Sequence, residues 1–378
     1  MSDSQGVTLI GHPFASIGMG EQLRACARAL DAAGVEYGIY DAYRHSKRTD
    51  PEYLELVASR EVAAVGAGVR IFHINGDEVE PVLSTMRQRG FDFTAGRNVV
   101  VPAWELPTYP SVWKTALDAF DEAWAISTYV HESLTRAGVR SHFVGQSLEI
   151  PNRPFLSRRH FGIRESSLVF LHFLDLTSFA TRKNPEAAVD VFERLRELRP
   201  LEDIQLVLKV KNGEAAAKEW TEELQERLPD AVFITDVLTA FETHSLIACC
   251  DCFISLHRAE GTGRGAGEAM WLGRSALATA WSGNMDYMDP RTALCVNYTL
   301  VPVPAGAYPH CEGQHWAEPD REHALEQVLT FVDNPASRLS RQAAARRAIA
   351  ERASNRVVGL RMLGRLQADR TEITHVTL

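Results

Sequence analysis

The chain has 378 residues, 45% of them hydrophobic, which suits a globular protein of two domains or one large α/β unit. The formal net charge of −9 argues against a dedicated nucleic-acid-binding protein, which normally carries a basic excess. The N-terminus lacks the pattern of a signal peptide, and no apolar run of about 18 residues predicts a membrane span. The cysteines at 249, 250 and 252 are interpreted as small buried hydrophobes rather than metal ligands, which fits a cytoplasmic protein.

Short apolar runs alternate with helical segments in the first part of the chain. Strands are predicted at 7–11, 35–40, 69–75, 98–102, 122–127 and 141–146, and helices at 18–33 and 128–137. Gly18 and Gly20 open the first helix, but Leu23 stands where a dinucleotide fingerprint needs a third glycine. The pattern therefore predicts a parallel α/β sheet and no NAD site at its first turn.

Polar residues follow two of these strands. His73 and Asn75 end the run at 69–75, and Trp104 and Glu105 follow the run at 98–102. Open α/β sheets bind ligands at the carboxyl ends of their strands, which makes all four residues candidates for a binding site. Two structural readings stay open, because His73 also fits a core histidine and Trp104 also fits a Trp-Pro packing corner.

The alternation restarts after a proline-containing linker at 149–160. Strands are predicted at 168–173, 204–210, 231–235, 253–256 and 293–296, and helices at 185–198, before 250, at 318–333 and over 338–370. The segment 299–319 contains four prolines and is predicted to be an irregular surface excursion.

A basic pair, Arg182 and Lys183, stands just before Pro185, which is well placed in a first helical turn. Two adjacent cations near a helix start favour a diphosphate, although a solvated surface pair is the alternative. Lys209 or Lys211, at the end of the strand 204–210, is a further candidate for the same ligand.

The most informative stretch runs from Cys252 to Asp286. An apolar strand leads into a loop with Glu260 and four glycines, at 261, 263, 265 and 267, and a helical turn is predicted from Glu268 to Gly273. A glycine loop that enters a helix offers backbone N–H groups to a phosphate. Carboxylates beside it are suited to the hydroxyl groups of a ribose or a sugar. Together these features indicate a nucleotide sugar.

Several segments here carry a resemblance to a known family. They are Glu260 and Glu268 with seven residues between them, Ala-Met-x-Leu-Gly at 269–273, Ser-Leu-His-Arg-x-Glu-Gly at 255–261, Ala-Thr-Ala-x-Ser-Gly-Asn-x-Asp at 278–286, and Trp-Glu-x-Pro at 104–107. They resemble a bacterial branch of glycosyltransferase family 4, whose retaining enzymes have the GT-B fold.

The resemblance implies two Rossmann-like domains with parallel sheets facing across a cleft, and a C-terminal helix that crosses back to the first domain. It divides the chain into an acceptor-side domain at 1–148, a linker at 149–160, a nucleotide-sugar-binding domain at 161–335, and a C-terminal helix at 336–378. The basic face of that helix is also suited to anionic lipid head groups, which would place the protein at the inner face of the membrane.

The resemblance also implies residue roles. Catalysis is assigned to Glu260, His73 and Lys183. Donor binding is assigned to Gly18, Arg182, Lys183, Lys209, Thr262, Gly263 and Glu268. The acceptor side is assigned to Asn75, Trp104 and Glu105. Two positions depart from the family pattern, because Thr262 replaces an aromatic residue and Ser178 replaces an arginine.

The function implied is transfer of a sugar from a UDP or GDP sugar to a saccharide or lipid-linked acceptor in surface polysaccharide or lipopolysaccharide synthesis, with retention at the anomeric carbon. The chain has no Asp-x-Asp, so we expect no metal and no other cofactor. Alternatives are glycosylation of a small metabolite, a sugar-nucleotide epimerase, a silent scaffold and a Rossmann oxidoreductase. The oxidoreductase would use Gly261, Gly263 and Ala266.

Overall fold

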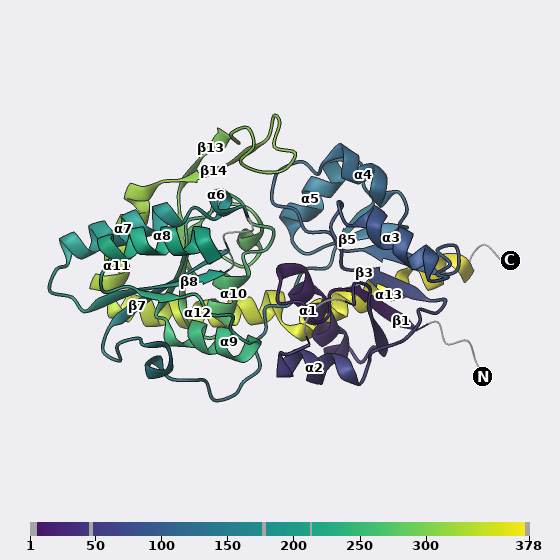
Figure 1. The fold of residues 1–378 in the computed structure, drawn as a ribbon, viewed down its shortest axis with the longest axis horizontal. Helices are drawn as coiled ribbons and strands as arrows, with labels where there is room; N and C mark the ends of the chain where they lie inside the picture. The colour runs from purple at the N-terminus through teal and green to yellow at the C-terminus, as the bar shows by residue number, and fades with distance from the viewer. Residues whose placement is uncertain (1–5, 45–47, 176–178, 212–213, 375–378) are drawn as a thin grey trace. The chain divides into compact units, whose positions relative to one another are not determined.

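A computed structural model describes residues 6–44, 48–175, 179–211 and 214–374 (Figure 1). These residues form two compact units, Met1–Leu148 with Glu351–Leu378, and Glu149–Ala350. We call them unit 1 and unit 2, and each is described by itself. Each unit is built on a six-stranded parallel sheet, so the predicted pair of Rossmann-like sheets is confirmed.

Unit 1 has the strand order β2-β1-β3-β4-β5-β6. Its strands are β1 Val7–Gly11, β2 Tyr37–Asp41, β3 Val69–Phe72, β4 Arg97–Val100, β5 Glu122–Ala125 and β6 Ser141–Phe143. Its helices before the linker are α1 Gly18–Ala32, α2 Pro51–Ala58, α3 Val79–Gln88, α4 Ser111–Leu117 and α5 Thr128–Arg136. The order changes direction between β1 and β3, which are paired in parallel through Ile10 and Phe72.

Unit 2 has the strand order β12-β11-β10-β7-β8-β9. Its sheet strands are β7 Leu168–Asp175, β8 Ile204–Lys211, β9 Val232–Ile234, β10 Cys252–Ser255, β11 Ser275–Thr279 and β12 Leu294–Val296. Its helices are α6 Ala180–Lys183, α7 Pro185–Leu198, α8 Glu214–Arg227, α9 Ala240–Cys249, α10 Arg264–Trp271 and α11 Arg321–Asp333, with short 3-10 turns at Arg158–Phe161 and Gly283–Asp286. This order changes direction between β7 and β10.

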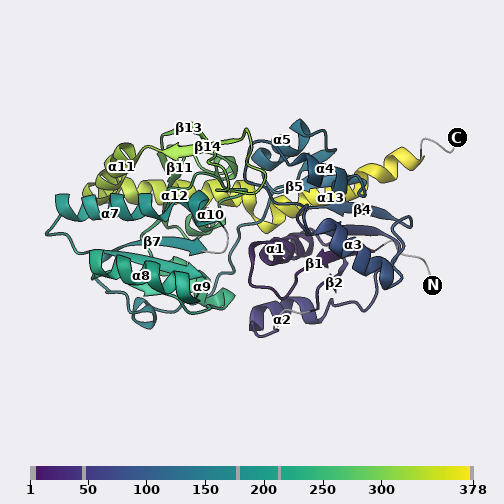
Figure 2. The same ribbon diagram turned by 45° about the horizontal axis from the view of Figure 1, so that its top comes forward.

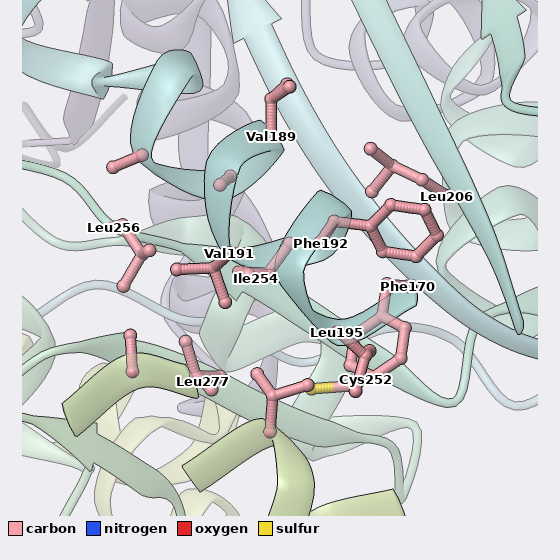
Figure 3. Packing of buried hydrophobic residues seen from close by; sticks show 14 of the residues in the cluster. Phe170, Val189, Val191, Phe192, Leu195, Leu206, Cys252, Ile254, Leu256 and Leu277 are labelled. Carbon is pink, nitrogen blue, oxygen red and sulfur yellow. The ribbon is translucent and has the colours of Figure 1, made fainter. Parts of the chain in front are cut away.

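The two faces of the unit 2 sheet are covered by different helices. Phe192 and Leu195 of α7 pack over Phe170, Ile254 and Leu277 of the strands (Figure 3). Residues of α8 and α11 belong to the same buried cluster. Neighbouring residues of a strand point to opposite faces, so this cluster leaves the other face of β10 for α10, which packs on β10 and β11. Figure 2 shows β7 and α10 within this unit.

Three predicted elements need correction. The segment 299–319 is irregular only at 303–314, because β13 Tyr298–Pro302 pairs antiparallel with β14 His315–Pro319. The prolines of the segment obscured the pattern, but Pro302 and Pro319 stand at strand ends, where a missing N–H is tolerated, and Pro304 and Pro309 lie in the connecting loop. The next helix begins at Arg321 rather than 318, since Glu318 belongs to β14. The helix predicted from Glu268 begins four residues earlier, at Arg264.

Two helices end the described chain: α12 Pro335–Ala353, most of which belongs to unit 2, and α13 Asn355–Thr374, which belongs to unit 1. Helix α13 packs on α1 of unit 1 through a close backbone contact. A Cβ atom added at Gly359 would lie 2.0 Å from the carbonyl oxygen of Ala29 and 3.0 Å from the Cβ of Ala33. The contact therefore requires glycine at 359.

A pair of glycine replacements on α13 tests this packing. Gly359→Ala is expected to lower the free energy of unfolding by about 1–3 kcal/mol, because the added methyl group meets backbone atoms. Gly364→Ala is the matched control, since a Cβ there meets nothing within 4 Å among the described residues. It should raise the free energy by about 0.5–1 kcal/mol through helix propensity alone. Urea unfolding of the full chain measures both, and equal effects would contradict the packing.

Candidate functional site

In unit 2, the change of strand direction brings two loops together. Parallel sheets bind ligands at the carboxyl ends of their strands, at the point where the strand order reverses. Here that point lies between β7 and β10. The segment after β7 carries Arg182 and Lys183 in the short helix α6, and the loop after β10 carries Glu260. Residues 77 positions apart in the sequence therefore meet.

Glu260 is the centre of this cluster. The Lys183 ammonium donates a hydrogen bond to its Oε1, and the Arg182 guanidinium lies 3.4 Å from its Oε2. The backbone N–H of Glu260 donates to Ser282 Oγ at 3.1 Å. The side chains of Glu260 and Arg182 are 10% and 7% exposed, whereas that of Lys183 is 24% exposed. Lys183 is therefore the cation that solvent or a ligand reaches more readily.

Burial and charge act in opposite directions on Glu260. Burial raises the pKa of its carboxyl group, while the charges of Lys183 and Arg182 lower it, and the balance leaves the pKa at about 2 against an ordinary 4.5. The carboxylate is therefore ionised at neutral pH. Burial also lowers the pKa of His172 and His257, and Lys183 and Arg182 have larger effects on the pKa of Glu260 than His257 has.

The low pKa of Glu260 predicts a loss of stability in acid. Because the folded-state pKa lies below the unfolded value, the carboxylate stabilises the fold above pH 4.5, and this stabilisation is lost as the pH falls toward 2. The full difference is on the order of 3 kcal/mol. Denaturant unfolding of wild type and Glu260→Gln at pH 7 and pH 3 checks it. The difference between the two proteins should shrink at pH 3, and an unchanged difference would contradict the assignment.

The Glu260 loop leads directly into the start of α10. Gly263 precedes the helix with a φ of +73°, a conformation that favours glycine. The Tyr287 hydroxyl donates to the carbonyl oxygens of Thr262 and Gly263, at 3.0 and 2.5 Å, and fixes the loop. No side chain caps the first N–H groups of α10, and the buried Thr262 hydroxyl has no hydrogen-bond partner among the described residues. This helix start is suited to an anion.

The second glutamate of the motif lies on the first turns of α10. Glu268 is buried, with a relative exposure of 6%, and receives a hydrogen bond from Arg264 one turn earlier. Arg258, in the loop after β10, makes two contacts that hold this loop in place. It donates to the carbonyl oxygen of Thr181 at 2.6 Å, and it binds the carboxylate of Glu318 in β14. Arg258 thus ties the loop after β10 to α6 and to the β13–β14 hairpin.

Unit 1 shows a comparable arrangement where its strand order reverses, between β1 and β3. His12 follows β1, and its Nε2 lies 2.8 Å from Oε1 of Glu78, which follows β3. The Tyr43 hydroxyl donates to the same oxygen at 2.5 Å, and the backbone N–H of Asn75 donates to the other oxygen at 2.8 Å. The carboxyl edge of this sheet therefore carries its own polar cluster.

Comparison with solved structures identifies the architecture. Two similar structures are HepE from Anabaena with UDP and glucose, at 12% identity over 96% of this chain and 100% of that chain with a TM-score of 0.68, and sucrose-phosphate synthase from Thermosynechococcus elongatus, at 15% identity over 98% and 100% with a TM-score of 0.68. OtsA is similar too, at 11% identity over 96% and 99% with a TM-score of 0.64. The fold is GT-B. No family profile and no curated protein sequence matches the chain.

Within this GT-B fold, most of the residues predicted to bind the donor lie close to the Glu260 cluster, but Lys209 points elsewhere. Lys183, Arg182, Glu260, Thr262, Gly263 and Glu268 lie on the loops and helix start after β7 and β10. Lys209 instead donates to the carbonyl oxygens of Asp236 and Val210, at 2.8 and 3.2 Å, which directs it toward the loop after β9. Burial lowers the pKa of Lys209 to about 8. Ser178 lies outside the described residues.

The predicted residues of unit 1 are mostly packed. His73 is buried, and burial lowers its pKa to about 3, so its imidazole is neutral. Gln22 lies 3.4 Å from its Nδ1, and its Nε2 has no hydrogen-bond partner among the described residues, so its catalytic role stays a prediction. Trp104 is 2% exposed, and its Nε1 donates to the carbonyl oxygen of Thr108. This geometry is that of a Trp-Pro packing corner, one of the two alternatives for Trp104. Its neighbour Glu105 is half-buried, and its carbonyl oxygen accepts from the Tyr129 hydroxyl.

The other two unit 1 candidates have different surroundings. Asn75 accepts a hydrogen bond from the backbone N–H of Ala103. Gly18 is exposed at the start of α1, and a Cβ there would meet nothing within 4 Å among the described residues. Gly20, two positions later, is the glycine that packing requires, since its Cβ would lie 2.3 Å from the carbonyl oxygen of Ala15.

The sequence analysis did not select several residues that the structure makes candidates for function. They are His12, Tyr43 and Glu78 in unit 1, and Arg258, Arg264 and Tyr287 in unit 2. The rule that ligands bind at strand ends could have singled out His12 and Glu78, but pairing them needs the order of the strands. In the part of the chain that the structure describes, no group of three or more His, Cys, Asp or Glu side chains is placed to hold a metal ion. No described helix is long and apolar enough to cross a membrane.

Proposed function

We propose that this protein is a glycosyltransferase that transfers a sugar from a nucleotide-diphosphate sugar to an acceptor hydroxyl. The observation that carries the proposal is the ion-paired Glu260, held by Lys183 and Arg182 where the strand order of unit 2 reverses, beside the uncapped start of α10. Cations, a helix start that no side chain caps and a buried carboxylate in one place match a ligand that carries both phosphates and hydroxyls.

The residues of the site divide the work between the two parts of such a donor. Lys183 and the first N–H groups of α10 face the diphosphate, whose leaving oxygen gains negative charge as the bond to the sugar breaks. Fixed positive groups at that position stabilise the transition state. Arg182 keeps Glu260 ionised, and Glu260 accepts hydrogen bonds from the sugar. Glu268 binds the ribose hydroxyls, and the Thr262 hydroxyl supplies one further polar contact.

The finer features of the proposal rest on the family resemblance. We expect retention at the anomeric carbon, and we expect Lys183 and Arg182 to take the place that a divalent metal has in other transferases. HepE is described with UDP and glucose, and this supports a UDP sugar as the donor, with a GDP sugar as the other choice. The acceptor is a saccharide or a lipid-linked saccharide, as in surface polysaccharide synthesis at the cytoplasmic side of the membrane.

Binding of nucleotides tests the proposal. The melting temperature of the full-length protein is measured with UDP, GDP, ADP, dTDP and NAD, and donor hydrolysis is then followed with the sugar form of the preferred nucleotide. A nucleoside diphosphate at 100 times its Kd should stabilise the fold by about 2.7 kcal/mol. Stabilisation by NAD alone, or by none of these nucleotides, would overturn the proposed function.

A further inference from the structure

We propose that Ser282 is a positioning residue, which keeps a strained backbone conformation so that its hydroxyl group fixes Glu260. The effect on sugar transfer rests on the proposed function, whereas the placement of Glu260 does not. Ser282 follows β11, in the segment 278–286 that carries part of the family resemblance. None of the residues assigned to the donor or the acceptor lies in that segment.

The backbone of Ser282 has a conformation that is essentially restricted to glycine. Its φ is +76° and its ψ is −151°. Five described residues other than glycine have a positive φ, and three of them border the Glu260 cluster. Phe179 and Asn184 flank α6, which carries Lys183, and Ser282 contacts Glu260 itself. Backbone strain of this kind persists where the surrounding structure imposes it, and it gathers at functional sites.

Two hydrogen bonds connect this segment to the main chain of Glu260. The backbone N–H of Glu260 donates to Ser282 Oγ at 3.1 Å, and the backbone N–H of Gly283 donates to the carbonyl oxygen of Glu260 at 3.2 Å. The main chain of Glu260 is therefore held at both of its polar groups. Ser282 is only 7% exposed, so water has little access to replace its hydroxyl group.

The residues that follow Ser282 impose its conformation. A Cβ atom at Gly283 would lie 1.9 Å from the carbonyl oxygen of Gly261, so the two loops are in contact through their main chains. Asn284 is fully buried, and its Nδ2 donates to the carbonyl oxygen of Thr279 at 3.0 Å. Because φ and ψ set the direction of a side chain, a relaxed backbone at Ser282 would turn its hydroxyl group away from Glu260.

Stability alone would favour glycine at position 282. Glycine adopts this conformation without strain, but it has no hydroxyl group to accept from the N–H of Glu260. Lys183 and Arg182 contact different oxygens of the Glu260 carboxylate, so the carboxylate is in place only when its main chain is. A serine at this position thus lowers stability and fixes Glu260.

Three variants of the full-length protein test this role. Ser282→Ala removes the hydroxyl group and keeps the strain, whereas Ser282→Gly removes both. Ser245→Ala is the matched control, because Ser245 of α9 is also buried and its hydroxyl group accepts from the backbone N–H of Leu156 at 3.2 Å. The measurements are thermal melting, steady-state kinetics with the preferred donor, and calorimetry with its nucleoside diphosphate.

We expect Ser282→Gly to melt at a higher temperature than Ser282→Ala, and yet both should lower kcat at least about tenfold through misplacement of Glu260. Nucleoside diphosphate affinity should stay close to that of the wild type in both. Ser245→Ala should lower the melting temperature and keep the wild-type kcat. Equal melting temperatures of the two Ser282 variants, or a wild-type kcat in either, would overturn the role.

A double-mutant cycle tests the placement of Glu260 without any activity. Glu260→Gln should cost less stability in Ser282→Ala than in the wild type, as measured by urea unfolding at pH 7, whereas Glu260→Gln and Ser245→Ala should be additive. Additivity of Ser282→Ala and Glu260→Gln would contradict the placement. Coupling between Ser282 and Glu260 in a protein that binds no nucleotide would instead keep the placement and reject the proposed transferase.

Discussion

Replacing Glu260 by glutamine is expected to lower the turnover number for sugar transfer by about 10²–10³-fold, the loss typical of one preorganised transition-state contact. Glutamine keeps the shape of the side chain but removes the charge that Lys183 and Arg182 balance. The affinity for the free nucleoside diphosphate should change by less than about threefold, because in our proposal Glu260 contacts the sugar. Steady-state kinetics with the preferred donor and calorimetry with its nucleoside diphosphate give the two numbers.

Two further variants make this result specific. Glu268→Ala should have the opposite pattern, with weaker nucleotide binding, since we assign Glu268 to the ribose. Glu322→Gln is the control for loss of an ion-paired carboxylate, because Glu322 pairs with Arg194 at the surface of unit 2, where its side chain is 72% exposed. It should leave both numbers unchanged. If Glu260→Gln and Glu268→Ala weakened nucleoside diphosphate binding equally, the proposed division of roles would be wrong.

Arg182→Met is expected to be the most destabilising single change at the site. Removing one partner of a buried ion pair costs about 3–5 kcal/mol where the other charge is left unpaired, and because Lys183 still pairs with Glu260 the loss here should lie at the lower end of that range. Arg182 and Glu260 are both buried, and Arg182 also donates to the carbonyl oxygen of Ala259 at 3.2 Å. Urea unfolding at pH 7 measures the loss.

A double-mutant cycle separates the charge from the packing. Adding Glu260→Gln to Arg182→Met should recover part of the stability, because the buried carboxylate that has lost one of its two cations is then gone. Arg194→Met is the matched control at the surface, where the loss should be at most about 1 kcal/mol. Strict additivity of Arg182→Met and Glu260→Gln would show that the two side chains do not act as a pair.

Much of the fold follows from local patterns. Val7–Gly11 and Pro185–Leu198 were predicted with the bounds that the structure has, because a β-type run and a proline-led amphipathic helix are strong local signals. Helix α10 was placed four residues late, since Gly265 and Gly267 are poor helix formers and made 264–267 resemble a loop. The β13–β14 pair was missed because prolines usually mark irregular segments, and pairing across 12 residues is not visible locally.

The residue types of the candidate site could be predicted from the sequence, but the contacts between them could not. Glu260 and Glu268 could be singled out as candidates because they flank a glycine loop, and Lys183 because it forms a basic pair before a helix, while their roles stay predictions. The pairing of Glu260 with Lys183 could not, because it depends on β7 and β10 being neighbours in the sheet. The same limit hid the contact of His12 with Glu78, 66 residues away. His73 and Trp104 are both buried, which their positions near strand ends did not predict, and their assigned roles stay predictions.

The central claim is that Glu260, Lys183 and the start of α10 hold a nucleotide sugar. A crystal structure of the protein with the preferred nucleotide sugar, obtained with Glu260→Gln to slow turnover, tests it most directly. We predict the diphosphate within hydrogen-bonding distance of Lys183 Nζ and of the first backbone N–H groups of α10, with the sugar against residue 260 and the ribose against Glu268. A nucleotide bound elsewhere in the chain, with these groups unoccupied, would contradict the account.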